Sequence, residues 1–229
     1  MAHRIVHSVP LLDLLESGSA TLANVAAELE REPHQVRSSG RNGWGCLHIA
    51  AYTFPAIGGM SDDDILAFAQ LMVEKGADRD LVDHKGRRAV CFSAQKGLVR
   101  TTKFLMQSAV HPTAIRSISA CTPAGLNLMH YAAVSGSVEL VNFLMSATFF
   151  PRNRIGMAQL GDIINARTRT GDIPAHYAAR ACDQEILAAL ERQGSRQSPN
   201  RARQTPRCIL PFPLAGLVEQ LGAVQLGGG

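Results

Sequence analysis

A short phrase built around a histidine recurs along the chain and limits what it can fold into. It reads GWGCLHIAAY from Gly43, GLNLMHYAAVSG from Gly125 and GDIPAHYAARA from Gly171, and more weakly GRRAVCFSAQKG from Gly86. These glycines lie 43, 39 and 46 residues apart. Self-similarity at such a period indicates an array of stacked units, in which each unit covers the apolar face of its neighbour.

An amphipathic stretch follows the phrase and predicts a second helix in each unit. In SDDDILAFAQLMVEKG, Ser61 and Asp64 have the spacing of a capping box at the start of a helix. The stretches around residues 138–145 and 186–190 repeat the pattern. In the first stretch the apolar residues form one stripe at helical spacing: Ile65, Phe68, Leu71 and Met72. Each of these stretches is therefore predicted to be a helix.

These phrases resemble the ankyrin repeat, whose motif runs Gly-x-Thr-Pro-Leu-His-x-Ala-Ala and ends, after a second helix, in Gly-Ala-Asp. The residues Gly76-Ala77-Asp78 match that ending. The resemblance implies an all-α fold, a solenoid of helix-turn-helix units joined by β-hairpin-like loops. The array is expected to span residues 1–194, with an N-terminal capping unit at 9–36 and repeats at about 37–78, 79–117, 118–163 and 164–194.

The spacing between the phrases predicts insertions, because an ankyrin repeat is about 33 residues long. One insertion is YTFPAIGGM, residues 52–60, and the others lie near HPTAIRS and PRNRIGMAQLG. In the first, the side chains of Phe54, Pro55, Ile57 and Met60 could form an apolar finger at the edge of the array or fold back against it. The sequence leaves both arrangements open.

The resemblance also implies structural roles for the repeated histidines and glycines. The histidines hydrogen-bond to backbone and helix-cap groups and connect one repeat to the hairpin of the next, while the glycines allow a turn with positive φ. These structural residues are His48, His130 and His176, with Gly43, Gly86, Gly125 and Gly171. We therefore interpret the histidines as structural rather than as catalysts or metal ligands.

The second repeat departs furthest from the motif. Cys91 replaces its histidine, Val90 replaces its leucine, and Arg88 occupies the cap position, where arginine is a poor residue. We predict that this repeat is the least stable unit of the array.

The sequence contains no recognisable catalytic or metal-binding pattern. It lacks GxSxG, a P-loop, GxGxxG after a strand, HExxH and paired Cys or His residues at zinc spacing. The acidic run at residues 62–64 is typical of a helix N-terminus. We expect no enzymatic activity and no cofactor.

The chain is also expected to be neither secreted nor membrane-spanning. No run approaches the roughly 18–20 uninterrupted apolar residues of a membrane helix, and the N-terminal stretch meets Asp13 and Glu16 before an adequate apolar core. The five cysteines show no CxxC spacing, which indicates reduced thiols. A cytoplasmic or nuclear location, or both, is expected.

Ankyrin arrays bind partner proteins through a concave surface of hairpins and first helices, and the resemblance implies the same here. Trp44 and Tyr52 are of residue types enriched at binding hot spots. Because the candidate residues include six basic side chains and one acidic, we expect a partner with an acidic patch; the alternative is a solvated face without a specific partner. By register, the candidates are Arg41, Asn42, Trp44, Tyr52, His84, Lys85, Arg87, Gln95, Lys96, Leu126, Val134, Arg169, Asp172 and Arg180.

Beyond Gly194 the composition changes, and residues 195–229 are predicted to be a basic linker followed by an apolar tail. The stretch SRQSPNRARQTPR is rich in Arg, Ser, Pro and Gln and is expected to have no fixed structure. Within it, Ser198 and Thr205 precede prolines and could be phosphorylated, while Asn165 occupies a position that is hydroxylated in some ankyrin proteins. The apolar tail could dock on the last repeat or bind a second protein.

The leading functional hypothesis is a monomeric, non-catalytic scaffold, inhibitor or adaptor that binds one or more proteins through the concave face. One alternative is a targeting subunit of a larger complex, such as a ubiquitin ligase or a phosphatase. Another is a regulator that contacts nucleic acid through the arginine-rich tail. Nucleic-acid binding is the less favoured reading, because the arginines are sparse and no aromatic residue lies among them.

Overall fold

The computed structural model describes residues 10–17, 19–40, 42–57, 59–106, 122–146 and 157–209. Within these ranges the chain forms helices, and its only β pairing is an isolated antiparallel bridge between Ser39 and Gly45. The prediction of an all-α repeat fold is therefore confirmed. Arg41, the insertion near HPTAIRS and the tail beyond residue 209 lie outside the described residues.

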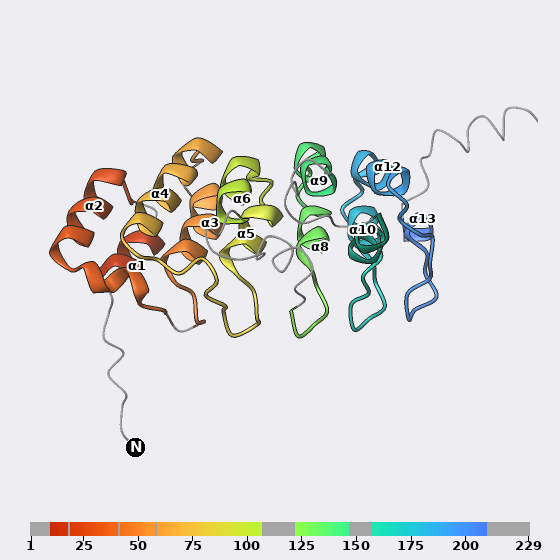
Figure 1. Cartoon of the computed structure of the whole chain (residues 1–229), viewed down its shortest axis with the longest axis horizontal. Coiled ribbons are helices and arrows are strands. Elements are labelled where there is room, and N and C mark those ends of the chain that lie inside the picture. Colours follow the sequence, from red (N-terminus) through yellow and green to blue (C-terminus); the bar gives the residue numbers. More distant parts are fainter. Residues whose placement is uncertain are drawn as a thin grey trace, which may run out of the picture.

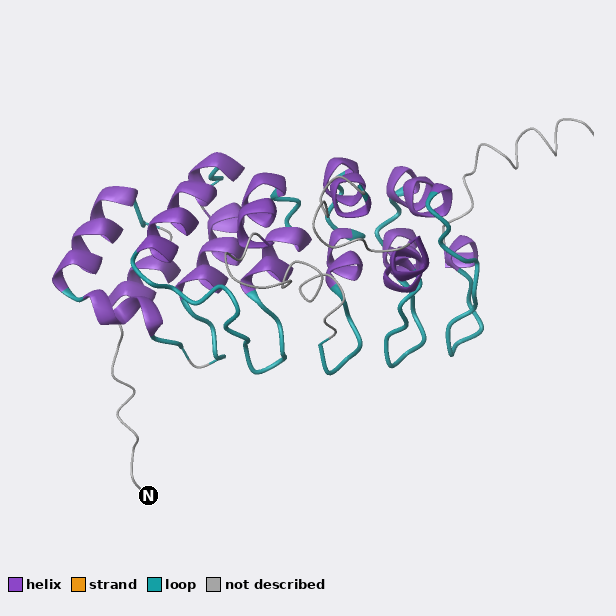
Figure 2. Cartoon of the chain, viewed as in Figure 1, coloured by secondary structure: helices purple, strands orange, loops and turns teal. Residues whose placement is uncertain are grey.

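Paired helices follow one another along the chain (Figures 1 and 2). The N-terminal unit consists of α1 (Pro10–Glu16), α2 (Leu22–Arg31) and the 3-10 helix η1 (Pro33–Arg37). The units that follow pair α3 (Cys46–Ile57) with α4 (Asp62–Glu74), α5 (Ala89–Gln95) with α6 (Val99–Met106), α8 (Leu128–Ala132) with α9 (Val138–Met145), and α11 (Pro174–Arg180) with α12 (Gln184–Arg192). The remaining helices are α10 (Met157–Ile164) and α13 (Pro206–Ile209).

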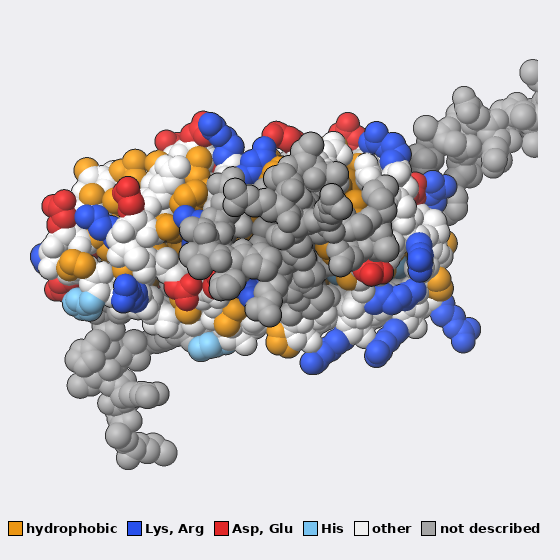
Figure 3. All heavy atoms as spheres, in the orientation of Figure 1, with side chains coloured by type: hydrophobic (Ala, Val, Ile, Leu, Met, Phe, Trp, Pro, Cys, Tyr) orange, Lys and Arg blue, Asp and Glu red, His pale blue; other side chains and the backbone are white. Residues whose placement is uncertain are grey.

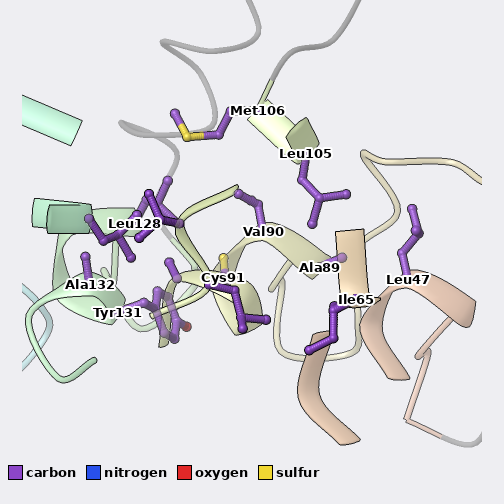
Figure 4. Packing of buried hydrophobic residues seen from close by; sticks show 14 of the residues in the cluster. Leu47, Ile65, Ala89, Val90, Cys91, Leu105, Met106, Leu128, Tyr131 and Ala132 are labelled. Carbon is purple, nitrogen blue, oxygen red and sulfur yellow. The ribbon is translucent and has the colours of Figure 1, made fainter. Parts of the chain in front are cut away.

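The units stack side by side into an elongated row with three levels (Figure 1). The second helices α4, α6, α9 and α12 form one long edge, the hairpins form the opposite edge, and the first helices lie between them. Side chains from successive units meet in one continuous apolar core, part of which is shown in Figure 4. Small residues such as Ala89 and Ala132 allow the first helices to approach closely.

The second helix of the first repeat begins as its sequence predicts. The Ser61 hydroxyl accepts a hydrogen bond from the Asp64 backbone N–H at 3.2 Å, and the Asp64 carboxylate accepts one from the Ser61 N–H at 3.1 Å. Ile65, Phe68 and Met72 of the predicted stripe are buried. The reciprocal cap satisfies two backbone donors that a helix start leaves free.

The insertion at residues 52–60 extends the first helix and packs against its own repeat. Phe54 is 1% exposed, and its ring centroid lies 4.7 Å from that of Phe68 on α4. Met60 also packs against the apolar core. Of the two arrangements that the sequence left open, the structure therefore contains the one in which the insertion folds back.

Each hairpin closes with the same backbone geometry. An N–H donates to the carbonyl four residues later at 2.9 Å in five places, between residues 40 and 44, 83 and 87, 122 and 126, 168 and 172, and 200 and 204. The residue before the closing carbonyl has positive φ, with values of 73°, 71°, 85° and 80° at Gly43, Gly86, Gly125 and Gly171. Glycine suits this position because a side chain is strained there.

The hairpin at residues 200–204 corrects the predicted end of the array. Arg203, with φ of 60°, occupies the position of the glycine and lies 32 residues after Gly171. Thr205-Pro206 matches the Thr-Pro of the repeat motif, and Cys208 stands where the histidine would be. Residues 195–209 therefore start a fifth repeat, whereas the sequence was interpreted as an unstructured linker from residue 195.

Side chains of the fourth repeat hold this added segment in place. The Arg207 guanidinium donates to both carboxylate oxygens of Glu191, at 2.9 and 2.7 Å. The Asn165 side chain donates to the Gly194 carbonyl at 3.1 Å and accepts from the Arg196 N–H at 2.8 Å. Arg207 was predicted to lie in an unstructured linker, and Asn165 was considered as a modification site. Both instead join the fourth repeat to the segment that follows it.

Each of the three repeated histidines connects a first helix to the next hairpin. His48 Nδ1 accepts the Gly45 N–H at 3.2 Å, so its Nε2–H is the group that donates to the Arg87 carbonyl at 3.1 Å. His130 makes the same pair of bonds with the Asn127 N–H and the Asp172 carbonyl. His176 bonds the Ile173 N–H at 3.1 Å and the Gln204 carbonyl at 2.9 Å. All three imidazoles are buried.

A second recurring bond joins neighbouring hairpins directly. The N–H of the second hairpin residue donates to a carbonyl of the preceding hairpin, from residue 84 to 42 at 3.1 Å, from 169 to 124 at 2.9 Å and from 201 to 170 at 3.0 Å. The corresponding residue of the third hairpin is Pro123, which has no N–H.

The junction between the second and third repeats lacks both recurring bonds. Cys91 stands in place of the histidine, and Pro123 removes the hairpin donor. Apolar contacts remain, with Cys91 of α5 facing the α8 residues that include Tyr131 (Figure 4). An exposed ion pair between Lys103 and Glu139, at 3.9 Å, adds little. Among the described residues, apolar packing therefore holds most of this junction together.

We expect the two sides of this junction to unfold in separate steps in urea. Trp44, the single tryptophan, reports only on the N-terminal side, whereas far-UV circular dichroism reports on all helices. The two signals should give different midpoints in the native sequence. Cys91→His should bring them together, since an imidazole there can donate to the Leu126 carbonyl and add about 1 kcal/mol.

The matched control is Cys208→His, which makes the same change at an exposed position. It should leave the separation of the two midpoints unchanged. Coincident midpoints in the native sequence would show that the junction is no weaker than the others.

We also expect stability to fall as the pH decreases from about 6.5 to about 4. Burial lowers the pKa of His130 to about 4, from the ordinary histidine value of 6.5. The unfolded chain then binds the proton more readily than the folded one, so stability is complete above pH 6.5 and is lost progressively as the pH falls to 4. His130 alone accounts for up to about 3 kcal/mol.

Urea unfolding at several pH values measures this effect. His130→Gln should be less stable at pH 7 and should show a shallower decrease toward pH 4. His34→Gln, at an exposed histidine, should keep the slope of the native protein. A free energy of unfolding that is constant across this range would contradict the assigned protonation of His130.

Candidate functional site

The predicted partner-binding residues lie on the hairpins and on the first helices. Asn42, Tyr52, His84, Lys85, Arg169 and Arg180 are exposed, whereas Trp44, Arg87, Gln95, Lys96, Leu126 and Val134 are half-buried. Asp172 is buried, with 4% of its surface exposed. The structure thus presents most of the predicted set to solvent, but Asp172 is too deeply placed for direct contact with a partner.

Three aromatic rings from two repeats form an aromatic cluster on this surface, made of Trp44, Tyr52 and Phe92. The Trp44 ring centroid lies 5.1 Å from those of both Tyr52 and Phe92, and the Tyr52 and Phe92 centroids are 5.5 Å apart. All the contacts are edge-to-face, the arrangement that aromatic quadrupoles favour. Phe92 is 1% exposed and Tyr52 is 39% exposed, so the cluster has a buried base and an open rim.

Two cations border the aromatic cluster. The Arg87 guanidinium lies 4.5 Å from the Phe92 ring centroid, and Lys96 Nζ lies 5.0 Å from that of Tyr52. Cations at this distance from an aromatic face are attracted to it. The rim of the cluster therefore combines an aromatic surface with positive charge.

Arg87 is not a free charge, because it is paired with Asp83. The guanidinium lies 2.7 Å from the Asp83 carboxylate, which also accepts from the Trp44 indole N–H at 3.2 Å. Burial acts to raise the pKa of Asp83, but hydrogen bonds from the Arg87 backbone and side chain lower it. Asp83 thus remains charged, neutralises Arg87 and fixes the orientation of the Trp44 ring.

Asp172 has the equivalent role at the C-terminal end. It accepts hydrogen bonds from the Arg180 guanidinium and the Asn200 amide, both at 2.8 Å, and from the Thr170 hydroxyl at 2.7 Å. Burial acts to raise its pKa, but these bonds lower it to about 2. Asp172, predicted to contact a partner, instead connects the fourth repeat to the fifth hairpin.

The sequence count of six basic residues to one acidic overstated the free charge of the surface. Of the predicted basic residues within the described chain, Arg87 and Arg180 belong to ion pairs. Lys85, Lys96 and Arg169 form no ion pair among the described residues, and the surface remains positive.

The fifth hairpin adds arginines that sequence reasoning assigned to a linker. Arg201 and Arg203 are exposed on it. Figure 3 shows basic side chains gathered along the hairpin edge near the C-terminal end of the array. The signal that could have placed them is Thr205-Pro206, which matches the motif although arginine replaces the preceding glycine.

Neither a metal-binding cluster nor a reactive buried thiol occurs among the described residues. No cluster of three or more His, Cys, Asp or Glu residues with metal-binding geometry occurs among them. Burial raises the pKa of Cys46 to about 12 and that of Cys91 to about 11, so both thiols are protonated at neutral pH. Among the same residues, no helix has the length and apolarity needed to cross a bilayer.

Comparison with known proteins agrees with the repeat geometry. Residues 57–154 match the family model described as ankyrin repeats in three copies. No curated protein matches the chain significantly. The hairpins and histidine bridges continue on both sides of the matched region, from residue 40 to residue 204. The chain therefore contains an array of ankyrin repeats.

Proposed function

We propose that the surface of hairpins and first helices binds a partner protein that carries an acidic patch. Ankyrin repeats indicate a protein-interaction module, and the finer assignment rests on one observation, the aromatic cluster with its cationic rim. Half-exposed aromatic residues beside a cation are typical of binding hot spots. Lys85 and Lys96 form no ion pair among the described residues. Both lie in the second of these two repeats, and positive charge there favours an acidic partner.

The role that fits this surface is that of a non-catalytic, monomeric scaffold, inhibitor or adaptor in the cytoplasm or nucleus. Two observations support a non-catalytic role. The buried thiols of Cys46 and Cys91 are protonated, and the buried histidines use both ring nitrogens in backbone bonds. Such groups have no free nitrogen or thiolate for chemistry.

The folding of residues 195–209 into a fifth repeat weakens the alternative that the arginine-rich segment binds nucleic acid. It depended on a disordered tail of arginines, but Arg207 is paired with Glu191 at 2.7 Å and the segment around it is folded. The targeting-subunit alternative differs from the scaffold role only in the identity of a second partner, which would bind elsewhere on the chain.

A quantitative pull-down from cell lysate tests the proposed surface. Tyr52→Ala/Lys96→Glu removes the exposed aromatic ring and reverses the adjacent charge. Loss of a hot spot costs about 2 kcal/mol, so capture of the partner should fall about 30-fold. Mass spectrometry of the captured proteins measures the change for each partner.

The control variant is Arg192→Glu, which makes the same change in net charge in the last turn of the second helix α12. It should capture the partner as the native chain does. Both variants should keep the helical circular dichroism and melting temperature within a few degrees of the native protein. Equal capture by all three proteins would refute a role for the aromatic cluster.

A further inference from the structure

The fourth and fifth hairpins border an open pocket of about 330 Å³ that is rich in arginine. Its lining includes Arg169 from the fourth hairpin, Arg180 from α11 and Arg201 from the fifth hairpin. Asp172 and Asn200, both buried, lie at its base. The pocket exists only because residues 200–204 fold as a hairpin.

The backbone fixes the two hairpins relative to each other. The Arg201 N–H donates to the Thr170 carbonyl at 3.0 Å, and the Asn200 side chain bridges the Asp172 carboxylate at 2.8 Å and the Gln204 N–H at 3.0 Å. A Cβ at Gly171 would lie 3.0 Å from the Arg201 nitrogen, so glycine permits this close approach. The arginines therefore extend from a firmly bonded base.

The pocket has an excess of positive charge. The only carboxylate in its lining is Asp172, and Arg180, Asn200 and Thr170 already donate to it. Arg169 and Arg201 are exposed and form no ion pair among the described residues. Three guanidinium groups against one carboxylate leave a net charge of about +2, which favours an anionic ligand.

We propose that this pocket binds a carboxylate side chain within an acidic peptide segment of the partner. The planar guanidinium presents paired N–H donors that match the two oxygens of a carboxylate. Lys85 and Lys96 lie in the second repeat, so one extended acidic segment could meet cations both there and at this pocket. The inference rests on the proposed function. It specifies which chemical group of the partner contacts the C-terminal end of the array.

Fluorescence anisotropy with the full chain and a fluorescein-labelled peptide of alternating glutamate and glycine tests the pocket directly. At physiological ionic strength the native chain should bind this peptide, and the same peptide with glutamine in place of glutamate should not bind. Arg169→Ala/Arg201→Ala should raise the Kd about tenfold. Arg169→Lys/Arg201→Lys keeps both positive charges but removes the planar pairs of N–H donors, and should give an intermediate Kd.

The matched control is Arg192→Ala/Arg196→Ala, which removes two exposed arginines outside the pocket. It should change the Kd less than about twofold. An equal loss of affinity for the glutamate peptide in both double variants would show that the effect comes from net charge alone. That result would contradict binding at the pocket. Failure of the native chain to bind the glutamate peptide would also overturn it.

Other anions separate this proposal from its rivals. A phosphoserine peptide or a single-stranded oligonucleotide that binds more tightly than the glutamate peptide, and is lost in Arg169→Ala/Arg201→Ala, would replace the carboxylate assignment. Tyr52→Ala/Lys96→Glu should retain the peptide at the pocket. If that variant loses the peptide while Arg169→Ala/Arg201→Ala retains it, the aromatic cluster binds the acidic segment, and this inference fails while the proposed function stands.

Discussion

The imidazole bridge between a first helix and the following hairpin is the interaction on which the array depends. Each histidine accepts a helix-cap N–H on one nitrogen and donates to a carbonyl of the next repeat on the other, so it must stay neutral. Burial, which lowers the pKa of His48 and His130, preserves that state. A single buried side chain thereby sets both the start of a helix and its distance from the next unit.

Where the bridge is missing, the array shows how repeats can stack without it. At the junction after the second repeat, Cys91 and Pro123 remove two polar links, and apolar contact between α5 and α8 remains. Because a solenoid has only nearest-neighbour contacts, no distant part of the chain can compensate. The junction therefore divides the surface into an aromatic N-terminal part and an arginine-rich C-terminal part.

The sequence predicted the fold where the motif is intact and failed where two of its residues changed together. The histidines, the hairpin glycines and the cap at Ser61 could be read directly. The fifth repeat was missed because Arg203 and Cys208 replace the glycine and the histidine that identify the others. The charge of the surface was overestimated for a different reason: the pairing of Arg87 with Asp83 depends on how the hairpin closes, which a count of charges does not contain.

The paired and unpaired cations have different parts in recognition. Arg87 and Arg180 are each held by a carboxylate, at 2.7 and 2.8 Å, so reversing their charge would disrupt the hairpins as well as any contact with a partner. Lys96, Arg169 and Arg201 have no such internal role among the described residues. Substitutions at these three positions can therefore change binding without changing the fold, which separates the chemistry of recognition from the stability of the array.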